Sequence, residues 1–381
     1  MIVKNESRAI CRCLESVKPF ITYWVIVDTG STDGTQAMIQ NYMKDIPGEL
    51  HELPWVDFAH NRNEALRLAK GKTDYLLFMD ADDVVETADN FIMPPLNKDG
   101  YSLVSLGQGA KCLTVLLVNN RLEWHWEGVL HEFLHLPDTR TYAPLPGITV
   151  RRNVKNAGFR SQDPKKFYKD AEILEAALQK EPDHARYQFY LAQSYSLAQE
   201  DQLALQHYEK RATMGGWDQE VFWSLFQIAI IKEKLKMPFE DIVEAYYKAY
   251  HSFFLPRAEP LYYLAKYYRK TKNYEKAYQV ALQGISIPEP DAQVFISDWM
   301  YEYGMALEFA ACAYMIKRYA EAQAALAQLL TKPHVPPPIR TLAETNQAAN
   351  GRRHMRLREK LCKGSLSLCV SLDHIGAGCK F

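Results

Sequence analysis

Long apolar runs are missing from this sequence, because no stretch of about 18 residues is free of charged side chains. The first residues reach Lys4, Glu6 and Arg8 before the apolar core of a secretory leader could form. Both absences predict a chain without a signal peptide or membrane span, and we expect it in the cytoplasm.

Cysteine is scarce and scattered. The seven cysteines are an odd number, they include no Cys-x-x-Cys pair, and no histidine lies at zinc-finger spacing. This argues against a disulfide framework and predicts reduced thiols. The cysteines are Cys11, Cys13, Cys112, Cys312, Cys362, Cys369 and Cys379.

An excess of one charge is also missing, since 45 Lys and Arg residues face 46 Asp and Glu residues. The net charge of −1 gives no global reason to bind nucleic acid or an acidic membrane. With 48% hydrophobic and 24% charged residues, the 381-residue chain has the composition of a folded protein. Its length favours two domains.

The N-terminal part alternates short apolar runs with amphipathic segments, which is typical of an α/β domain with a mainly parallel sheet. We expect helices between the first four strands. The predicted strands cover residues 1–3, 23–27, 49–52, 74–79, 102–106, 113–118 and 123–126.

The C-terminal part is predicted to be helical, beginning with Asp163 as N-cap and Pro164 at the first helical position. A Leu-Ala pair, an aromatic residue and further alanines recur from Leu191 and from Leu264, in the order of a tetratricopeptide helix pair. A Pro-rich break and a helix stop at Asn350-Gly351 follow. The predicted parts are an α/β domain over 1–160, an all-α repeat domain over 161–350 and a basic tail over 351–381.

Two expected strands end in carboxylates. Asp28 follows an apolar strand and precedes a turn rich in Gly, Ser and Thr, so it is placed either to bind a base or ribose or to cap the turn. Asp80, Asp82 and Asp83 follow the strand over 74–79. Three carboxylates at one strand end repel each other unless a cation compensates, which indicates a metal–diphosphate site.

A helix between these strands carries Arg62 and Asn63 near its start. A guanidinium and an amide there are placed to face a nucleotide, although a surface arginine is the plainer interpretation.

In this order, the segments 1–6, 28–35, 62–63 and 80–83 resemble those of family 2 glycosyltransferases of the GT-A fold, over about residues 1 to 135. With the helical repeats, the chain resembles bacterial glycosyltransferase–tetratricopeptide fusions, including those that glycosylate peptides. The resemblance implies a nucleotide-sugar donor, usually UDP-linked, and a Mn or Mg ion. It places on the donor Val3, Asn5, Glu6, Asp28, Arg62, Asn63, Asp80, Ala81 and Asp82, with Asp80 and Asp82 as metal ligands.

The segment 124–132 resembles the Trp-x-Gly-x-x-His-Glu segment of these fusions. Glu132 is the preferred base for the acceptor proton, and Asp83 competes for that role. His131 is a candidate third ligand for the metal or phosphate, and the tryptophans are candidates to stack on sugars. A core histidine beside a surface glutamate is the plainer alternative.

Two features depart from the family. The chain begins inside the family's first strand, so either Met1 is a late start or the strand is clipped. Residues 149–161 also lack the metal-binding histidine of many GT-A enzymes and carry Arg151, Arg152 and Arg160 instead. Metal binding then relies on the acids and His131, or is weak.

The main hypothesis is an inverting hexosyltransferase that uses a nucleotide-sugar and acts on a peptide, protein or glycan presented by the repeats. The rival is a repeat scaffold that binds protein partners and whose transferase domain no longer turns over. A nucleotidyltransferase is least favoured, because the basic Gly-rich phosphate loop is absent from the first strand end.

Overall fold

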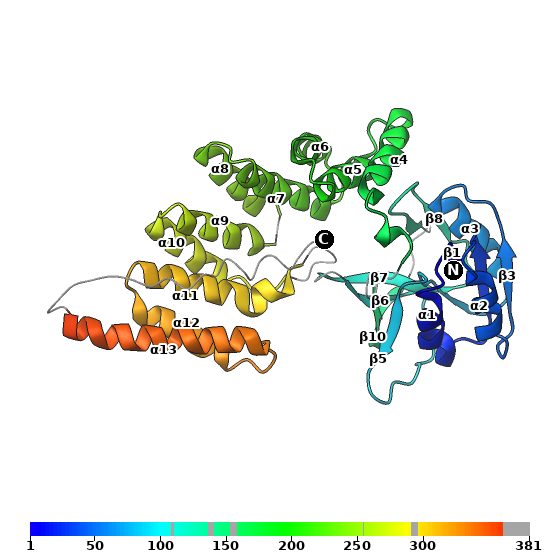
Figure 1. Ribbon diagram of the computed structural model, residues 1–381, viewed down its shortest axis with the longest axis horizontal. Helices are drawn as coiled ribbons and strands as arrows, with labels where there is room; N and C mark the ends of the chain where they lie inside the picture. The colour runs from blue at the N-terminus through cyan, green and yellow to red at the C-terminus, as the bar shows by residue number, and fades with distance from the viewer. Residues whose placement is uncertain (108–109, 136–140, 153–157, 254, 291–295, 361–381) are drawn as a thin grey trace. The chain divides into compact units, whose positions relative to one another are not determined.

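The computed structural model describes all residues except 108–109, 136–140, 153–157, 254, 291–295 and 361–381 (Figure 1). The described residues divide into two compact units, one over Met1–Ala204 and one that begins at Leu205. The first unit begins with an α/β domain and the second is helical, so the predicted fold class is confirmed.

The first unit begins with a parallel sheet in the order β1-β2-β3. Its register pairs Val3 with Asp28 and Asp28 with Glu52, so the three carboxyl ends lie at one edge. Ile10 and Leu14 of α1 and Ile39 of α2 are buried in the core beside this sheet. The elements are β1 (Ile2–Val3), α1 (Ile10–Val17), a 3-10 turn (Lys18–Phe20), β2 (Trp24–Asp28), α2 (Thr35–Tyr42), β3 (Gly48–Glu52) and α3 (Phe58–Ala69).

A second, mixed sheet has the order β4-β7-β6-β10-β5, in which the β6–β10 pair is parallel and the β4–β7, β6–β7 and β5–β10 pairs are antiparallel. The expectation of a mainly parallel sheet holds for the first three strands and is wrong for this sheet. The sequence also gave no sign of β5, β9 and β10. In β10, Pro144, Pro146 and Gly147 obscure the strand pattern. The strands are β4 (Tyr75–Leu77), β5 (Val84–Thr87), β6 (Gly100–Gly107), β7 (Ala110–Asn119) and β10 (Tyr142–Arg151), with a separate hairpin of β8 (His125–Glu127) and β9 (Phe133–His135).

The first unit ends with helices. α4 (Lys166–Lys180) has Lys165 as its N-cap, so the predicted N-cap at Asp163 is two residues early. The Asp163 carboxylate instead accepts a hydrogen bond from the Lys165 backbone N–H in the preceding turn, at 2.9 Å. A 3-10 turn (Arg160–Gln162) precedes α4, and α5 (Ala185–Leu197) packs against it.

In the second unit each helix from α7 to α13 packs on the next. The pattern predicted from Leu264 onward is buried, including Leu264, Ala265, Tyr268, Ala277 and Ala281. The predicted stop at 350–351 is wrong, because two poor helix formers cost only about 1 kcal/mol each and α13 continues through them. The helices are α6 (Asp201–Thr213), α7 (Asp218–Lys234), α8 (Phe239–His251), α9 (Glu259–Lys270), α10 (Tyr274–Ile285), a π-helical turn (Met300–Gly304), α11 (Met305–Met315), α12 (Tyr319–Leu330) and α13 (Pro337–Lys360).

The same turn recurs after α5, α7, α9 and α11. Its central residue is left-handed although it is not glycine: Gln199, Lys236, Lys272 and Lys317 have φ of 65°, 54°, 65° and 67°. In each case the next backbone N–H bonds to the carbonyl five residues earlier, as Asn273 does to Tyr268 at 2.8 Å. This is the Schellman arrangement of a helix C-terminus, and its recurrence marks the repeats.

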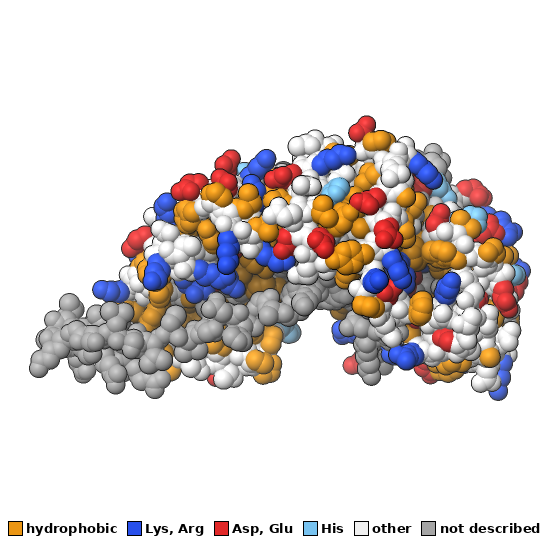
Figure 2. Space-filling view, turned by 45° about the horizontal axis from the view of Figure 1, so that its top comes forward, with side chains coloured by type: hydrophobic (Ala, Val, Ile, Leu, Met, Phe, Trp, Pro, Cys, Tyr) orange, Lys and Arg blue, Asp and Glu red, His pale blue; other side chains and the backbone are white. Residues whose placement is uncertain are grey.

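Among the described residues, no helix is both long and apolar enough to cross a membrane. On the face seen in Figure 2, basic and acidic side chains are interspersed. Cys11, Cys13, Cys112 and Cys312 are free thiols, whereas the three cysteines beyond residue 360 lie outside the described part.

Candidate active site

Two loops are bonded together at the carboxyl edge of β1 and β2. The Asn5 backbone N–H donates to Ser31 Oγ at 2.8 Å, and the Thr32 N–H donates to Asn5 Oδ1 at 2.8 Å. The Glu6 N–H donates to Thr35 Oγ1 at 2.9 Å. Asn5 has a left-handed φ of 55°, which asparagine tolerates better than most residues. The predicted positions Asn5 and Glu6 therefore lie in one rigid wall with the loop after Asp28.

Asp28 is fully buried and uses its two carboxylate oxygens differently. One oxygen accepts from the backbone N–H groups of Gly30 at 2.9 Å and Ser31 at 2.8 Å and from Gln36 at 3.2 Å. The other is buried without a hydrogen-bond partner. Asp28 thus caps the turn, as the plainer interpretation expected, and still offers an acceptor atom.

Arg62 joins two carboxylates that are far apart in sequence. Its Nη2 lies 2.6 Å from Asp80 Oδ1, and its Nε lies 2.5 Å from Glu132 Oε1. The guanidinium also lies 5.0 Å from the ring centroid of Trp126. Desolvation works to raise the pKa of Asp80, but Arg62 and Arg152 outweigh it and hold the pKa at about 2. Asp80 is therefore ionised at neutral pH.

Arg152, the residue after β10, is a second cation at this place. Its Nη1 lies 2.6 Å from Asp83 Oδ2 and 3.3 Å from Asp80 Oδ2. The sequence analysis noted Arg152 only as standing where a histidine was expected. Its position after the last strand of the sheet was the available signal, but the sequence did not reveal that strand.

The carboxyl groups of Glu6 and Asp82 both have raised pKa values, so their ionised forms are poorly stabilised in this structure. Glu6 Oε1 accepts from the Phe159 N–H at 3.1 Å, while Oε2 is buried without a hydrogen-bond partner. Desolvation raises the pKa of Glu6 to about 7, and Asp82, Asp33 and Asp80 add to the rise. Desolvation and the charge of Asp80 likewise raise the pKa of Asp82. A hard divalent cation would relieve both shifts, so these oxygen donors fit such an ion.

A pocket of about 320 Å³ is lined by Asp80 and by both arginines, Arg62 and Arg152. Of the two candidate bases, Glu132 lines it, whereas Asp83 is 2% exposed and is not part of the lining. The basic lining residues are Arg62, Arg152, Arg160 and Lys166, and the acidic ones are Asp80, Glu132 and Asp170. The sequence analysis missed Lys166 and Asp170, because they belong to α4, which it assigned to the repeats.

His131 also lines this pocket, with a left-handed φ of 53°. Its ring stacks on Tyr190 of α5 with centroids 3.8 Å apart, and Arg186 donates to its carbonyl at 3.2 Å. The residue as a whole is exposed, yet desolvation by the surrounding protein, with the charges of Arg186, Lys166 and Arg160, lowers the pKa of its imidazole to about 3. The imidazole is therefore neutral at pH 7, as a metal ligand must be.

Three predicted donor contacts have other partners in this structure. The Asn63 amide accepts from the Trp126 N–H at 2.7 Å and donates to the Trp126 carbonyl at 2.9 Å. The Val3 carbonyl accepts from Thr29, and Ala81 is buried in the core beside β1. Contact of these groups with a donor stays a prediction.

The two tryptophans expected to stack on sugars are largely buried, and stacking on a sugar stays a prediction. Trp124 and Trp126 are buried together with Leu66 and Val118. Trp126 reaches the pocket through the ring that lies beneath Arg62. These two rings pack β8 and the residues before it against α3.

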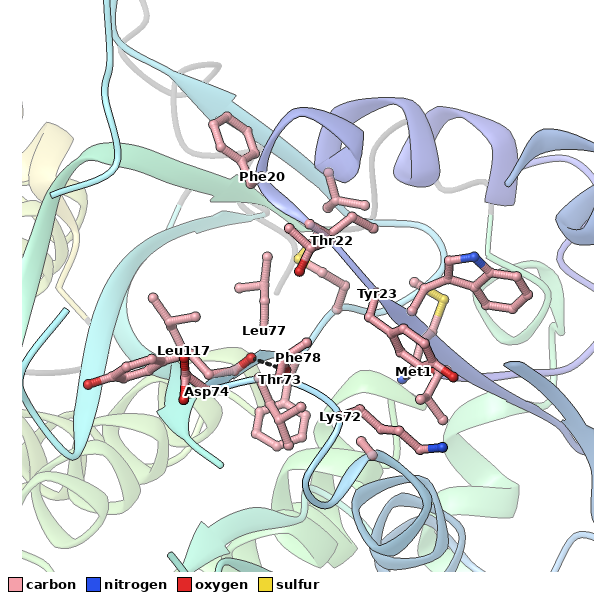
Figure 3. A pocket seen from close by; sticks show the side chains of 18 of the residues that line it. Met1, Phe20, Thr22, Tyr23, Lys72, Thr73, Asp74, Leu77, Phe78 and Leu117 are labelled. Atoms are coloured by element: carbon pink, nitrogen blue, oxygen red, sulfur yellow. Dashed lines mark hydrogen bonds between the residues drawn. The ribbon is translucent and has the colours of Figure 1, made fainter. Parts of the chain in front are cut away.

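A larger pocket of about 530 Å³ lies between residues of β2 and β4. Its walls are mainly apolar, and Figure 3 shows Phe20, Leu77, Phe78 and Leu117 around it. No motif in the sequence indicated this pocket. The convergence of acidic and basic groups that phosphate chemistry requires is found in the smaller pocket.

Comparison with known proteins shows which family the N-terminal part of the chain resembles. Residues 1–127 match the model of Glycosyl transferase family 2. The TPR repeat-containing protein Synpcc7942_0270 of Synechococcus elongatus is 37% identical over 84 residues, 22% of this chain and 19% of that protein. The SPbeta prophage-derived glycosyltransferase SunS of Bacillus subtilis is 22% identical over 231 residues, 55% of this chain and 51% of SunS.

The matched segments therefore span about a fifth and about half of these relatives. Among solved structures, the MamA protein aligns with 54% of this chain and 89% of its own, at 12% identity and a TM-score of 0.33, too low to indicate a shared fold. The family match and the observed elements agree. The chain carries a family 2 glycosyltransferase domain joined to tetratricopeptide-like helical repeats.

Proposed function

We propose that this chain is an inverting hexosyltransferase that takes its sugar from a nucleotide-sugar donor, with UDP as the nucleotide. The observation that supports this most is the polar pocket, in which Arg62 links Asp80 to Glu132 and Arg152 faces Asp80 from the other side. Such a pocket offers both cations for a diphosphate and a carboxylate for proton transfer.

The donor's nucleotide would lie along the wall formed by the loops after β1 and β2. The buried oxygen of Asp28 that lacks a partner is an acceptor suited to an N–H of the base or a hydroxyl of the ribose. Arg152, Arg160 and Lys166, which line the pocket, would supply positive charge to the phosphates.

Asp80 and Asp82 would hold a Mn or Mg ion, with His131 as a further candidate ligand. The raised pKa values of Glu6 and Asp82 support a cation at this place. When bound, the ion would carry part of the negative charge that develops on the departing nucleotide diphosphate.

Glu132 would act as base, accepting the proton of the acceptor as its nucleophilic atom bonds to C1 of the sugar and the bond from C1 to the diphosphate breaks. Arg62 orients this carboxylate by its 2.5 Å contact. We propose a peptide, protein or glycan as acceptor, since stacked helix pairs present extended binding surfaces and one relative is a glycosyltransferase of similar sequence.

The test is release of nucleotide diphosphate by the purified chain with Mn²⁺ and a panel of UDP-sugars and GDP-mannose. We expect release with one donor and its loss in the double variant Asp80→Ala with Asp82→Ala. The matched control is Asp74→Ala, which removes a carboxylate from an exposed ion pair with Arg121.

Two outcomes would count against the proposal. Release that survives in the double variant would overturn the role of the acids. A folded chain that releases nothing from any donor, with or without peptide and glycan acceptors, would favour the rival, a binding scaffold without turnover.

A further inference from the structure

The β8–β9 hairpin carries a second group of metal-binding side chains, separate from the acids after β4. The ligand atoms of His125, Glu127 and His135 all lie within 4.8 Å of one another. His125 Nε2 is 2.6 Å from Glu127 Oε1, and the rings of His125 and His135 are 5.1 Å apart. Within the described part of the chain, this is the one group of three such ligands at this spacing.

Strand register explains why these three side chains meet. His125 is paired directly with His135 across the antiparallel hairpin, so their side chains lie on the same face. Glu127 is two residues from His125 and shares that face, because side chains alternate along a strand. The intervening Trp126 and its partner Leu134 point to the other face, where they pack with the core.

The chemistry of this group favours zinc. Two imidazole nitrogens and one carboxylate oxygen are a ligand set that zinc binds, with water completing a tetrahedron. Zinc ligands lie about 2.0–2.2 Å from the ion and thus about 3.3 Å from one another. The His125 and Glu127 side chains are 42% and 45% exposed, so they can rotate to that spacing without disturbing the core. Manganese and magnesium prefer all-oxygen sites such as the acids after β4.

We propose that His125, Glu127 and His135 bind one zinc ion on the solvent face of the β8–β9 hairpin. The ion would link the two strands at the base of the loop Gly128–Glu132, which carries both His131 and Glu132. Since Glu132 is ion-paired to Arg62, the ion would fix the position of a pocket residue without touching the pocket. Zinc binding here does not depend on the proposed transferase activity.

The test is a zinc titration of the full chain in competition with a chromophoric chelator, with Mg²⁺ present to fill the oxygen sites. We expect one tight site. His125→Ala and His135→Ala should each weaken it at least as much as the roughly 10–100-fold that loss of an outer partner costs a zinc site. Glu127→Gln, which keeps the side chain's shape, should weaken it in the same direction.

The chain offers a matched control in β3. His51 Nε2 lies 2.9 Å from Glu49 Oε2, also two residues away on one strand, but among the described residues this pair has no third metal-binding side chain at that spacing. His51→Ala should leave the tight site unchanged. Cobalt in place of zinc should give the intense visible absorption of a tetrahedral site in the wild type and in His51→Ala, and lose it in His135→Ala.

Three results would overturn the proposal: no tight site in the wild type, equal zinc affinity in the wild type and all hairpin variants, or equal losses in His51→Ala and His135→Ala. Circular dichroism of each variant shows whether it is folded. If the alanine variants unfold, Glu127→Gln and the cobalt spectrum of the wild type decide the matter.

Discussion

Arg62 is the residue on which the pocket depends, because it is the cation that touches both Asp80 and Glu132. Its planar fork of donors allows these two contacts to be made at once. A lysine at this position would keep the charge but present a single ammonium group.

We therefore predict that Arg62→Lys lowers the rate of nucleotide diphosphate release by roughly 10²–10³-fold, the usual loss when one preorganised donor is removed. The control is Arg67→Lys in the same helix, where the arginine pairs with Glu64 at an exposed position. Steady-state kinetics of both variants decide the prediction, which fails if the two substitutions have equal effects.

The raised pKa of Glu6 should make the free energy of unfolding depend on pH. Its pKa is raised from 4.5 to about 7 in the folded chain, mainly by desolvation. Between these values the folded chain binds more protons than the unfolded chain, so this residue makes the free energy of unfolding fall as the pH rises from about 4.5 to 7. Glu6→Gln should therefore be more stable than the wild type at pH 8, and the difference should shrink toward pH 5.

Asp33 serves as a control, because its pKa is lowered and its effect on stability should have the opposite sign. Desolvation works to raise its pKa, but hydrogen bonds from Thr35 and Ser7 hold it at about 2. Asp33→Asn should be less stable than the wild type at pH 8, with the difference lost as the pH falls through the acid range. The measurement is urea unfolding, at pH 5, 6, 7 and 8 for Glu6→Gln and from pH 8 down to about pH 3 for Asp33→Asn. A lower stability of Glu6→Gln than of the wild type at pH 8 would contradict the account.

At the scale of elements, the left-handed turns of the repeats carry a cost that glycine would remove. Lys272 joins α9 to α10 with φ of 65°. A left-handed residue with a β-carbon costs about 1–2 kcal/mol, and the extra chain entropy of glycine offsets about 0.5–1 kcal/mol of that. Lys272→Gly should therefore raise the free energy of unfolding by about 0.5–1 kcal/mol.

The control for this substitution lies two residues earlier. Lys270 is the last residue of α9, where glycine should cost up to about 1 kcal/mol because the backbone is helical. Thermal unfolding of the two variants would refute the prediction if both substitutions changed the midpoint in the same direction.

The elements also show what a sequence can and cannot reveal. Parallel strands such as β2 were predictable because an apolar run, a carboxylate and a Gly-rich turn follow one another locally. The repeat helices were predictable from their small residues at fixed spacing. β10 was not, because its prolines and glycine hide a strand that only its neighbours β6 and β5 stabilise.

The residues of the candidate site also differ in whether a local sequence pattern marks them. Asp28, Arg62 and Asp80 are marked by local motifs and lie where strand ends and helix starts place them. Arg152 and Lys166 reach the pocket through the tertiary fold, and no local pattern marks them. That Arg62 would touch Glu132, 70 residues away, likewise depends on the packing of β8 against α3.

At the scale of the whole molecule, each unit has charges buried in its own interior. In the second unit, Arg257 and Glu259 are fully buried, with Nη2 and Oε1 2.6 Å apart, and Tyr301 also donates to Glu259. Removing one member of a buried pair leaves the other uncompensated, which costs about 3–5 kcal/mol.

Glu259→Gln should therefore destabilise the second unit by about this amount, and hydrogen exchange should quicken in its helices. Arg318→Ala is the control, because Arg318 and Glu321 form an exposed pair in the same unit and its loss should cost under about 1 kcal/mol. Equal exchange rates in the wild type and Glu259→Gln would contradict the prediction.

The wall of the polar pocket includes side chains from α4, and the ring of His131 rests on α5. A transferase cut from this chain after the last strand would lose Lys166, Asp170 and Tyr190 together. Recombination that exchanges repeats between such proteins would therefore preserve the pocket only if the crossover falls beyond α5. The first helix pair is therefore part of the framework of the pocket.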